Sequence, residues 1–122
     1  MTTLVPYLTL GLGDATLRLL TDGLGFEVVT EQRGDDGAIG HIELRRGDAI
    51  VMGGTGEPSI GTSPGLYLVV DDVDAMYEAA LAAGATPGYP PEDTLWGTRR
   101  ARFTDPDGHE WSIGTYQPGS AR

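Results

Sequence analysis

The sequence predicts an α+β domain in which a β-α-β-β-β unit occurs twice. The chain has 122 residues, which suits one domain with a buried core. Short runs of alternating apolar and polar residues, typical of strands, surround only two stretches with helical periodicity. These stretches, residues 14–25 and 72–84, are nearly equal in length, and each runs from a capping Asp to a Gly. We therefore expect an internal repeat.

The first unit is expected to contain one helix and four strands. Asp14 is a candidate N-cap for a helix over residues 15–22, which Gly23 and Gly25 would end. Residues 35–37, Asp-Asp-Gly, are typical of a hairpin turn between the second and third strands. The strands are expected at residues 6–10, 26–29, 41–44 and 49–52.

The second unit repeats this order. Asp72 or Asp74 would cap a helix over residues 75–83, which Gly84 would end. Strands are expected at residues 65–70, 98–104 and 110–113, with a Pro-rich segment at 87–91. Residues 105–108, Asp-Pro-Asp-Gly, place Asp, Pro and Gly where a type I turn favours them. The predicted boundaries are residues 1–55 for the first unit, 56–64 for a linker, 65–117 for the second unit and 118–122 for a flexible tail.

The composition excludes several classes of function. A net charge of −10 argues against nucleic-acid binding, because neutralising phosphates needs a basic surface. The chain has no cysteine, and therefore no disulfide, thiolate metal site or cysteine nucleophile. No apolar run is long enough to span a membrane, and the first residues do not form a signal-peptide pattern. We expect a cytoplasmic protein with no membrane or nucleic-acid partner.

Three stretches in the two halves resemble one known superfamily. They read PYLTLGLGDA, LYLVVDDVDAMYEAALAAGA and WGTRRARFTDPDGHEW. Together they resemble the vicinal oxygen chelate superfamily, which includes glyoxalases, bleomycin-resistance proteins and extradiol dioxygenases. The resemblance implies two βαβββ modules that form a half-open, eight-stranded, barrel-like sheet around a ligand cup. It also implies a homodimer with the cup at or near the dimer interface.

The resemblance implies four metal positions, and this chain fills none of them with a usual ligand. The positions correspond to Tyr7, to Val51 or Met52, to Gly65 and to Ser112. None of these side chains supplies the imidazole nitrogen or carboxylate oxygen that such a metal needs. We therefore expect no metal and no other cofactor, in likeness to the metal-free antibiotic-binding members of the superfamily.

Side-chain alternation predicts which residues face the cup. The apolar residues of each strand should face the helices, which leaves the alternate residues for the cup. Residues 49–52 are apolar on both faces and leave their orientation open. The assignment requires one extra residue, a bulge, near the turn between Phe103 and Glu110. The residues expected to contact ligand are Tyr7, Thr9, His41, Glu43, Met52, Tyr67, Trp96, Arg100, Arg102, Glu110 and Ser112.

Some of these residues allow a second interpretation. His41 and Glu43 could act as a base and its partner or as metal ligands, but a polar pair on a strand face is favoured. Tyr7 and Tyr67 could act as acid or base, but stacking on a flat ligand is favoured. Trp96 follows a loop of Pro and acidic residues, and we expect it to touch ligand or a dimer partner.

Other residues near the second strand pair are less specific. Arg99, Arg100 and Arg102 could bind an anionic group or form salt bridges, and the sequence leaves both open. Trp111 is expected in the core, and His109 is expected to be a solvated turn residue.

The expected function is metal-independent binding and sequestration of a small, aromatic molecule. The alternative is a lyase, isomerase or oxygenase-type enzyme of the same superfamily. It would be metal-free or use a rearranged metal site, with His41, Glu43 and Glu110 as candidate catalytic residues. A third hypothesis is a partner module whose cup has no ligand.

Overall fold

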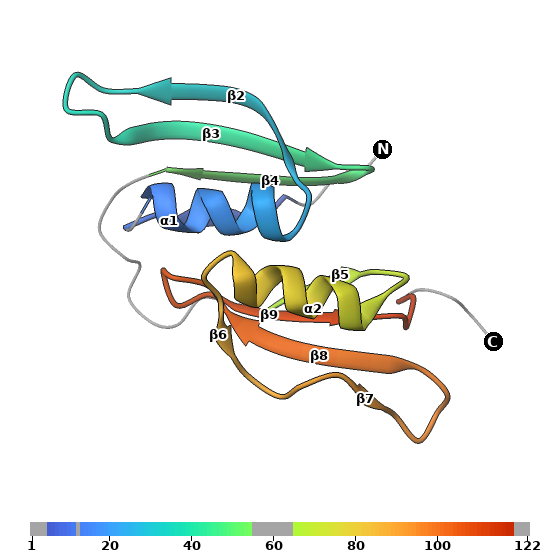
Figure 1. Cartoon of the computed structure of the whole chain (residues 1–122). Helices are drawn as coiled ribbons and strands as arrows, with labels where there is room; N and C mark the ends of the chain where they lie inside the picture. Colours follow the sequence, from blue (N-terminus) through green and yellow to red (C-terminus); the bar gives the residue numbers. More distant parts are fainter. Residues whose placement is uncertain (1–4, 12, 55–64, 119–122) are drawn as a thin grey trace.

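The computed structural model describes residues 5–11, 13–54 and 65–118, and it contains two separate β-sheets (Figure 1). The first sheet has the strand order β1-β4-β3-β2, with β1 parallel to β4 and the other pairs antiparallel. Its strands are β1 (Tyr7–Thr9), β2 (Glu27–Arg33), β3 (Ile39–Arg46) and β4 (Ala49–Gly54).

The second sheet has the order β5-β9-β8-β6, with β7 also paired to β8. Here β5 is parallel to β9, as β1 is to β4, so the two sheets share this type of strand pairing. The strands are β5 (Leu66–Val69), β6 (Thr86–Pro87), β7 (Glu92–Asp93), β8 (Arg99–Thr104) and β9 (Glu110–Gly114). The helical segments are α1 (Gly13–Arg18), a π-helical turn η1 (Leu19–Gly23) and α2 (Val73–Ala82).

The described residues do not confirm the eight strands of the expected half-open, barrel-like sheet. They contain nine strands in two open sheets, and neither sheet closes into a barrel. The extra strand arises because the edge of the second sheet is split into β6 and β7. Pro90 and Pro91 lie between these strands and have no N–H to donate to a ladder. Gly88 packs so closely on β8 that a Cβ would lie 2.6 Å from the Arg102 carbonyl oxygen.

One predicted helix cap is confirmed and one is wrong. The Asp72 carboxylate caps α2 and accepts a hydrogen bond from the Ala75 backbone N–H at 3.0 Å, so Asp72 rather than Asp74 is the cap. Because α1 begins at Gly13, Asp14 lies inside its first turn. Its carboxylate accepts a hydrogen bond from Arg33 at 2.7 Å instead of capping the helix.

The two helices lie side by side between the two sheets (Figure 1), and α2 contacts η1. Buried residues from both modules form one core, in which the Phe26 and Trp111 rings meet edge to face at 6.5 Å. A hydrogen bond from the Thr16 hydroxyl to the Asp107 carboxylate also joins the modules. Each sheet therefore has one face on the helices and one face without a helix.

The predicted bulge is confirmed at Gly108. Phe103 pairs with Trp111, and the Asp105 N–H bonds the His109 carbonyl oxygen at 2.9 Å. Gly108 donates to the Asp105 carbonyl oxygen and has φ 89°, the conformation of the first residue of a G1 bulge. This extra residue keeps all predicted core residues of β8 and β9 on the helix side.

The structure also settles the orientation of β4, which the sequence left open. Val51 is buried against the core, and Met52 is on the helix-free face. The predicted linker, residues 56–64, and residues 119–122 of the predicted tail lie outside the described residues. Neither α1 nor α2 is long and apolar enough to cross a membrane, and no other described segment forms such a helix.

Candidate ligand-binding site

A concave pocket of about 630 Å³ lies on the second sheet. Four aromatic rings and three arginines contribute to its walls, with hydroxyl groups between them. The lining residues are Tyr67, Tyr89, Thr94, Trp96, Thr98, Arg99, Arg100, Arg102, Ser112 and Tyr116. Five of the predicted ligand contacts, Tyr67, Trp96, Arg100, Arg102 and Ser112, are thus brought together.

Two of the arginines stack on the aromatic walls. The Arg100 guanidinium lies 5.3 Å from the centre of the Tyr89 ring and 5.7 Å from that of Trp96. The Arg102 guanidinium lies 5.2 Å from the centre of the same Tyr89 ring. Distances in this range give an attractive cation–π interaction. The stacking holds both cations at the pocket wall.

The acidic partners of these two arginines are exposed. Arg100 has an ion-pair contact of 3.5 Å with Glu92, which exceeds the usual hydrogen-bond length. Arg102 donates to the Ser112 hydroxyl at 3.1 Å and contacts Glu110 at 3.3 Å. Glu110, a predicted ligand contact, does not line the pocket and is an ion-pair partner of Arg102.

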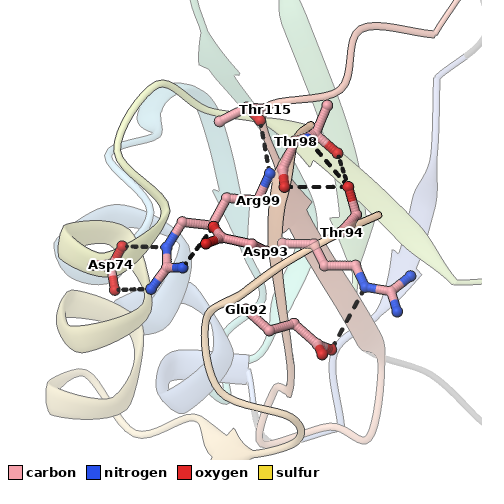
Figure 2. Close-up of polar contacts among 8 residues, drawn as sticks. Asp74, Glu92, Asp93, Thr94, Thr98, Arg99 and Thr115 are labelled. Atoms are coloured by element: carbon pink, nitrogen blue, oxygen red, sulfur yellow. Dashed lines mark hydrogen bonds and ion pairs between the residues drawn. The ribbon is translucent and has the colours of Figure 1, made fainter. Parts of the chain in front are cut away.

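Arg99 has a different role, which Figure 2 shows. Its guanidinium donates twice to the Asp74 carboxylate of α2, at 2.7 and 2.9 Å, and once to Asp93 of β7, at 2.9 Å. The bond from Arg99 lowers the pKa of the Asp74 carboxyl below its usual value. For Arg99 the structure therefore supports the salt-bridge alternative, in which the side chain ties α2 to the edge of the sheet.

A short hairpin presents Trp96 to the pocket. The Thr94 N–H bonds the Thr98 carbonyl oxygen at 2.8 Å. The two hydroxyls lie 2.8 Å apart, and Figure 2 shows the contact between these two side chains. Gly97 completes the turn with φ 89°, a conformation that favours Gly. Trp96 remains 63% exposed and Leu95 beside it is fully exposed. The hairpin thus holds a large aromatic ring at the edge of the pocket.

Tyr67 lies across the floor of the pocket. Its hydroxyl donates to the Tyr116 carbonyl oxygen at 2.8 Å. Gly114 leaves room for the ring, because a Cβ there would lie 2.6 Å from the Tyr67 hydroxyl. Burial raises the pKa of Tyr67 above its ordinary value, so the phenol stays neutral near pH ~7. A neutral ring suits stacking rather than proton abstraction.

The remaining predicted contacts form a second cluster on the first sheet. Tyr7 is paired with Met52, and Met52 with Glu43 across the next strand. His41 lies 2.9 Å from the Glu43 carboxylate through Nε2. Thr9 follows on β1, but none of these residues lines the 630 Å³ pocket. Within one chain, the eleven predicted contacts therefore occupy two sheets rather than one cup.

The alternative catalytic set is not assembled within the chain. His41 and Glu43 are neighbours on β3, whereas Glu110 is on β9 of the other sheet. In the described part of the chain, no group of three or more His, Asp or Glu side chains is placed to hold a metal ion. The rearranged metal site of the enzyme alternative would therefore need residues from both sheets, which a single chain does not bring together.

The strand pairing corrects one of the four expected metal positions. Tyr7 is paired with Met52 in the first sheet, and Tyr67 with Ser112 in the second. Tyr67, not Gly65, is therefore the counterpart of Tyr7: each lies six residues before the first residue of its helix, Gly13 or Val73. The expected position was two residues off because it was counted from Asp14, which is not a helix cap. The set Tyr7, Met52, Tyr67 and Ser112 contains no imidazole or carboxylate, so its donor chemistry does not fit a superfamily metal.

The turn after β8 is a buried polar network rather than a solvated loop. The Asp105 carboxylate accepts bonds from the backbone N–H of Asp107 and of His109, from the Trp111 indole at 3.0 Å and from His109 Nδ1 at 2.7 Å. The hydrogen bond between His109 Nδ1 and the Asp105 carboxylate raises the pKa of His109, although burial of the ring acts in the opposite direction. The expectation of a solvated His109 is wrong, whereas Trp111 is in the core as expected.

Sequence reasoning missed several residues of the pocket wall. Tyr89 reaches the pocket because its carbonyl oxygen accepts the Arg102 N–H at 3.0 Å, which aligns the Pro-rich segment with β8. Tyr116 continues the alternation of Ser112 and Gly114 by one more step, a signal that could have placed it on this face. The hydroxyls of Thr94 and Thr98 carried no such signal.

Comparison with known sequences gives a family and a relative. The sequence profile of the Glyoxalase/Bleomycin resistance protein/Dioxygenase superfamily matches residues 11–113. The uncharacterized protein Mb0911c of Mycobacterium bovis is 39% identical over 93 residues, which cover 66% of this chain and 61% of that protein. The chain therefore spans less than two thirds of the length of this relative.

Solved structures agree with this match. TioX from Micromonospora sp. ML1 is 28% identical with a TM-score of 0.75, and the match covers 98% of this chain and 100% of that chain. The fosfomycin resistance protein FosX from Mesorhizobium loti is 20% identical and similar in fold, with a TM-score of 0.71 over 97% of this chain and 93% of that chain. Because the superfamily profile covers most of the sequence, this chain belongs to the glyoxalase/bleomycin resistance protein/dioxygenase superfamily.

Proposed function

We propose that this protein binds and sequesters a small, planar aromatic molecule without a metal. The observation that carries the proposal is the 630 Å³ pocket with aromatic walls. Pockets for drug-sized ligands have volumes of roughly 300–1,000 Å³ and combine apolar walls with a few polar groups. Tyr67, Tyr89, Trp96 and Tyr116 supply the walls, while the arginines and hydroxyls supply the polar groups.

Binding alone would be sufficient for protection. A protein that holds a toxic compound lowers its free concentration by mass action, and no reaction is required. A fosfomycin resistance protein is similar in fold, which is consistent with a role in drug resistance. We place this activity in the cytoplasm, where such a protein would intercept the compound.

The donor chemistry of the chain supports the proposed metal independence. The four positions given by the strand pairing hold two phenols, a thioether and a hydroxyl, at Tyr7, Tyr67, Met52 and Ser112. Protein sites for zinc, iron, nickel or manganese use imidazole, carboxylate or thiolate ligands, and this chain has no cysteine. We therefore expect chelator treatment to leave ligand affinity unchanged.

We further propose that the protein works as a homodimer. The first sheet has a helix-free face on which Tyr7 is 58% exposed, beside Met52 and the His41–Glu43 pair. In a two-fold dimer, this face of one chain can cover the pocket of its partner. Light scattering during gel filtration should give twice the chain mass, and Tyr7→Glu should yield a monomer. A monomeric wild type would contradict this part of the proposal.

A binding panel tests the main proposal. Naphthalene, anthracene and pyrene, each carrying a carboxylate, carboxamide or aminomethyl group, are titrated by calorimetry and thermal shift. At least one ring system should bind with one site per chain and raise the melting temperature. EDTA should change its affinity less than about twofold. If no compound binds in any of its three forms, the proposed function is refuted.

Matched variants show whether binding uses the pocket. Trp96→Ala should weaken binding of the aromatic probe by about tenfold, because stacking and burial against the indole are lost. Leu95→Ala changes the neighbouring residue, which is fully exposed and does not line the pocket. Equal losses in the two variants would show that the probe binds elsewhere.

The enzyme alternative rests on the hydrogen-bonded pair of His41 and Glu43. A histidine beside a carboxylate can accept and return a proton. Incubation of bound probes followed by mass spectrometry would detect a product. If a product forms, and if His41→Gln or Glu43→Gln abolishes it without changing affinity, the enzyme alternative replaces sequestration.

A further inference from the structure

The pocket wall contains two arginines whose charges are only partly matched by acidic partners. Arg99 beside them makes three hydrogen bonds of 2.7–2.9 Å to two carboxylates, so its charge is matched by acidic partners. Arg100 has one carboxylate contact of 3.5 Å, and Arg102 has one of 3.3 Å plus a neutral hydroxyl at 3.1 Å. A guanidinium has five N–H donors, so both retain donors for a further acceptor.

The stacking on Tyr89 fixes where these donors lie. Both guanidinium groups are 5.2–5.3 Å from the centre of that ring, which limits the movement of two long side chains. Side chains held in place lose less conformational entropy when they bind a ligand. The arrangement is therefore a preorganised pair of cations inside an aromatic pocket.

Arg100 and Arg102 are a pair of cations in a chain whose net charge is strongly negative. The net charge is −10, and all eight basic residues are arginines. Two of the eight are adjacent on one face of β8, where strand alternation places Arg100 and Arg102 on the same side. In a chain with this net charge, the remaining N–H donors of the two arginines offer an anionic group direct hydrogen bonds.

We propose that the ligand is a planar aromatic compound that bears an anionic oxygen group, such as a carboxylate, and that Arg100 and Arg102 bind this group. The inference rests on the proposed function, because it names the ligand class of the same pocket. The ring would pack against Tyr67, Trp96 and Tyr116, with its anionic group at the two guanidiniums. Arginine forks bind carboxylates through paired, charge-assisted hydrogen bonds.

The three forms of each panel compound test the inference. For a ring that binds, the carboxylate should bind about tenfold more tightly than the carboxamide, since charge-assisted hydrogen bonds are roughly twice as strong as neutral ones. The aminomethyl form should bind most weakly. If the carboxamide equals the carboxylate, the inference is overturned and the proposed function stands. If the cation binds most tightly, Glu92 and Glu110 are the recognition groups and the inference is again overturned.

Variants that each remove one positive charge show which arginines bind the carboxylate of the ligand. Arg100→Gln and Arg102→Gln should each weaken carboxylate binding by about fivefold and carboxamide binding by less than twofold. Arg18→Gln removes the same charge from an exposed helix position and is the control. Retained carboxamide affinity shows that the pocket is intact in each variant. If the three variants weaken carboxylate binding equally, only the overall charge matters and the inference is overturned.

Discussion

The buried carboxylate of Asp105 offers the sharpest test of how the second hairpin is stabilised. Its side chain is fully buried and is held by four donors from three residues: the backbone N–H of Asp107, the backbone N–H and Nδ1 of His109, and the Trp111 indole. Asp105→Asn keeps the shape of the side chain but removes its charge. It also replaces one acceptor oxygen by an NH₂ group. At least one of the four surrounding donors would then face another donor instead of an acceptor.

The expected loss is about 3–5 kcal/mol in the free energy of unfolding, the range for removing one partner of a buried ion pair. Hydrogen bonds to a charged group contribute about 1.5–3 kcal/mol each, so losing one or two of them gives a similar figure. For a domain of this size, we expect the melting temperature to fall by about 10–20 °C.

Urea unfolding followed by circular dichroism measures this loss. Asp35→Asn is the control, because it makes the same change at an exposed turn position and should stay within about 0.5 kcal/mol of wild type. A loss below about 1 kcal/mol for Asp105→Asn would refute the reasoning. It would mean that the carboxylate is solvated or that the hairpin rearranges freely.

Three further predictions follow from individual contacts. Since the folded-state pKa of His109 is raised, its contribution to stability is complete below pH ~6.5 and is lost as pH rises through the folded pKa. Urea midpoints between pH ~6 and pH ~9 should fall for wild type and change less for His109→Gln. Gly54→Ala should lower the free energy of unfolding, measured in urea, by about 1–3 kcal/mol, because the added Cβ would lie 2.6 Å from the Gly40 carbonyl oxygen. Gly65→Ala is the control and should change it little, because the nearest atom to its Cβ would be 3.8 Å away. If Tyr67 acts by stacking, calorimetry should find the probe affinity of Tyr67→Phe within about threefold of wild type and that of Tyr67→Leu about tenfold lower. Equal losses in the two variants would indicate that the hydroxyl is required.

The local sequence determined most of the secondary structure. Asp72 and Gly84 mark the two ends of the second helix. The Asp72 carboxylate accepts a free N–H of the first turn, and Gly84 can adopt φ 109° after the last turn. Alternation in β8 and β9 identified the core face, and the requirement for consistent faces predicted the bulge now found at Gly108. These signals depend on neighbouring residues, and a single sequence contains them.

Errors occurred where distant segments decide the outcome. His109 looked like a solvated turn residue, but its ring is covered by the core and paired with Asp105. Asp14 had a good capping sequence, yet Arg33 from β2 takes its carboxylate. For Asp14 the partner became available only through folding, whereas for His109 the partner is local and the burial of its ring is what folding decides.

The sequence by itself determined the family and the lack of imidazole or carboxylate side chains at the expected metal positions, because these depend on residue types at fixed spacings. Only the tertiary structure decided which residues share a site. The helices between the sheets turn the two helix-free faces into separate surfaces, so the predicted contacts divide between them (Figure 1). The Pro-rich edge brings Tyr89 beneath Arg100 and Arg102, and Arg99 is taken up by α2. Cross-strand pairing and packing set these contacts, and they leave no trace in the spacing of residues along the chain.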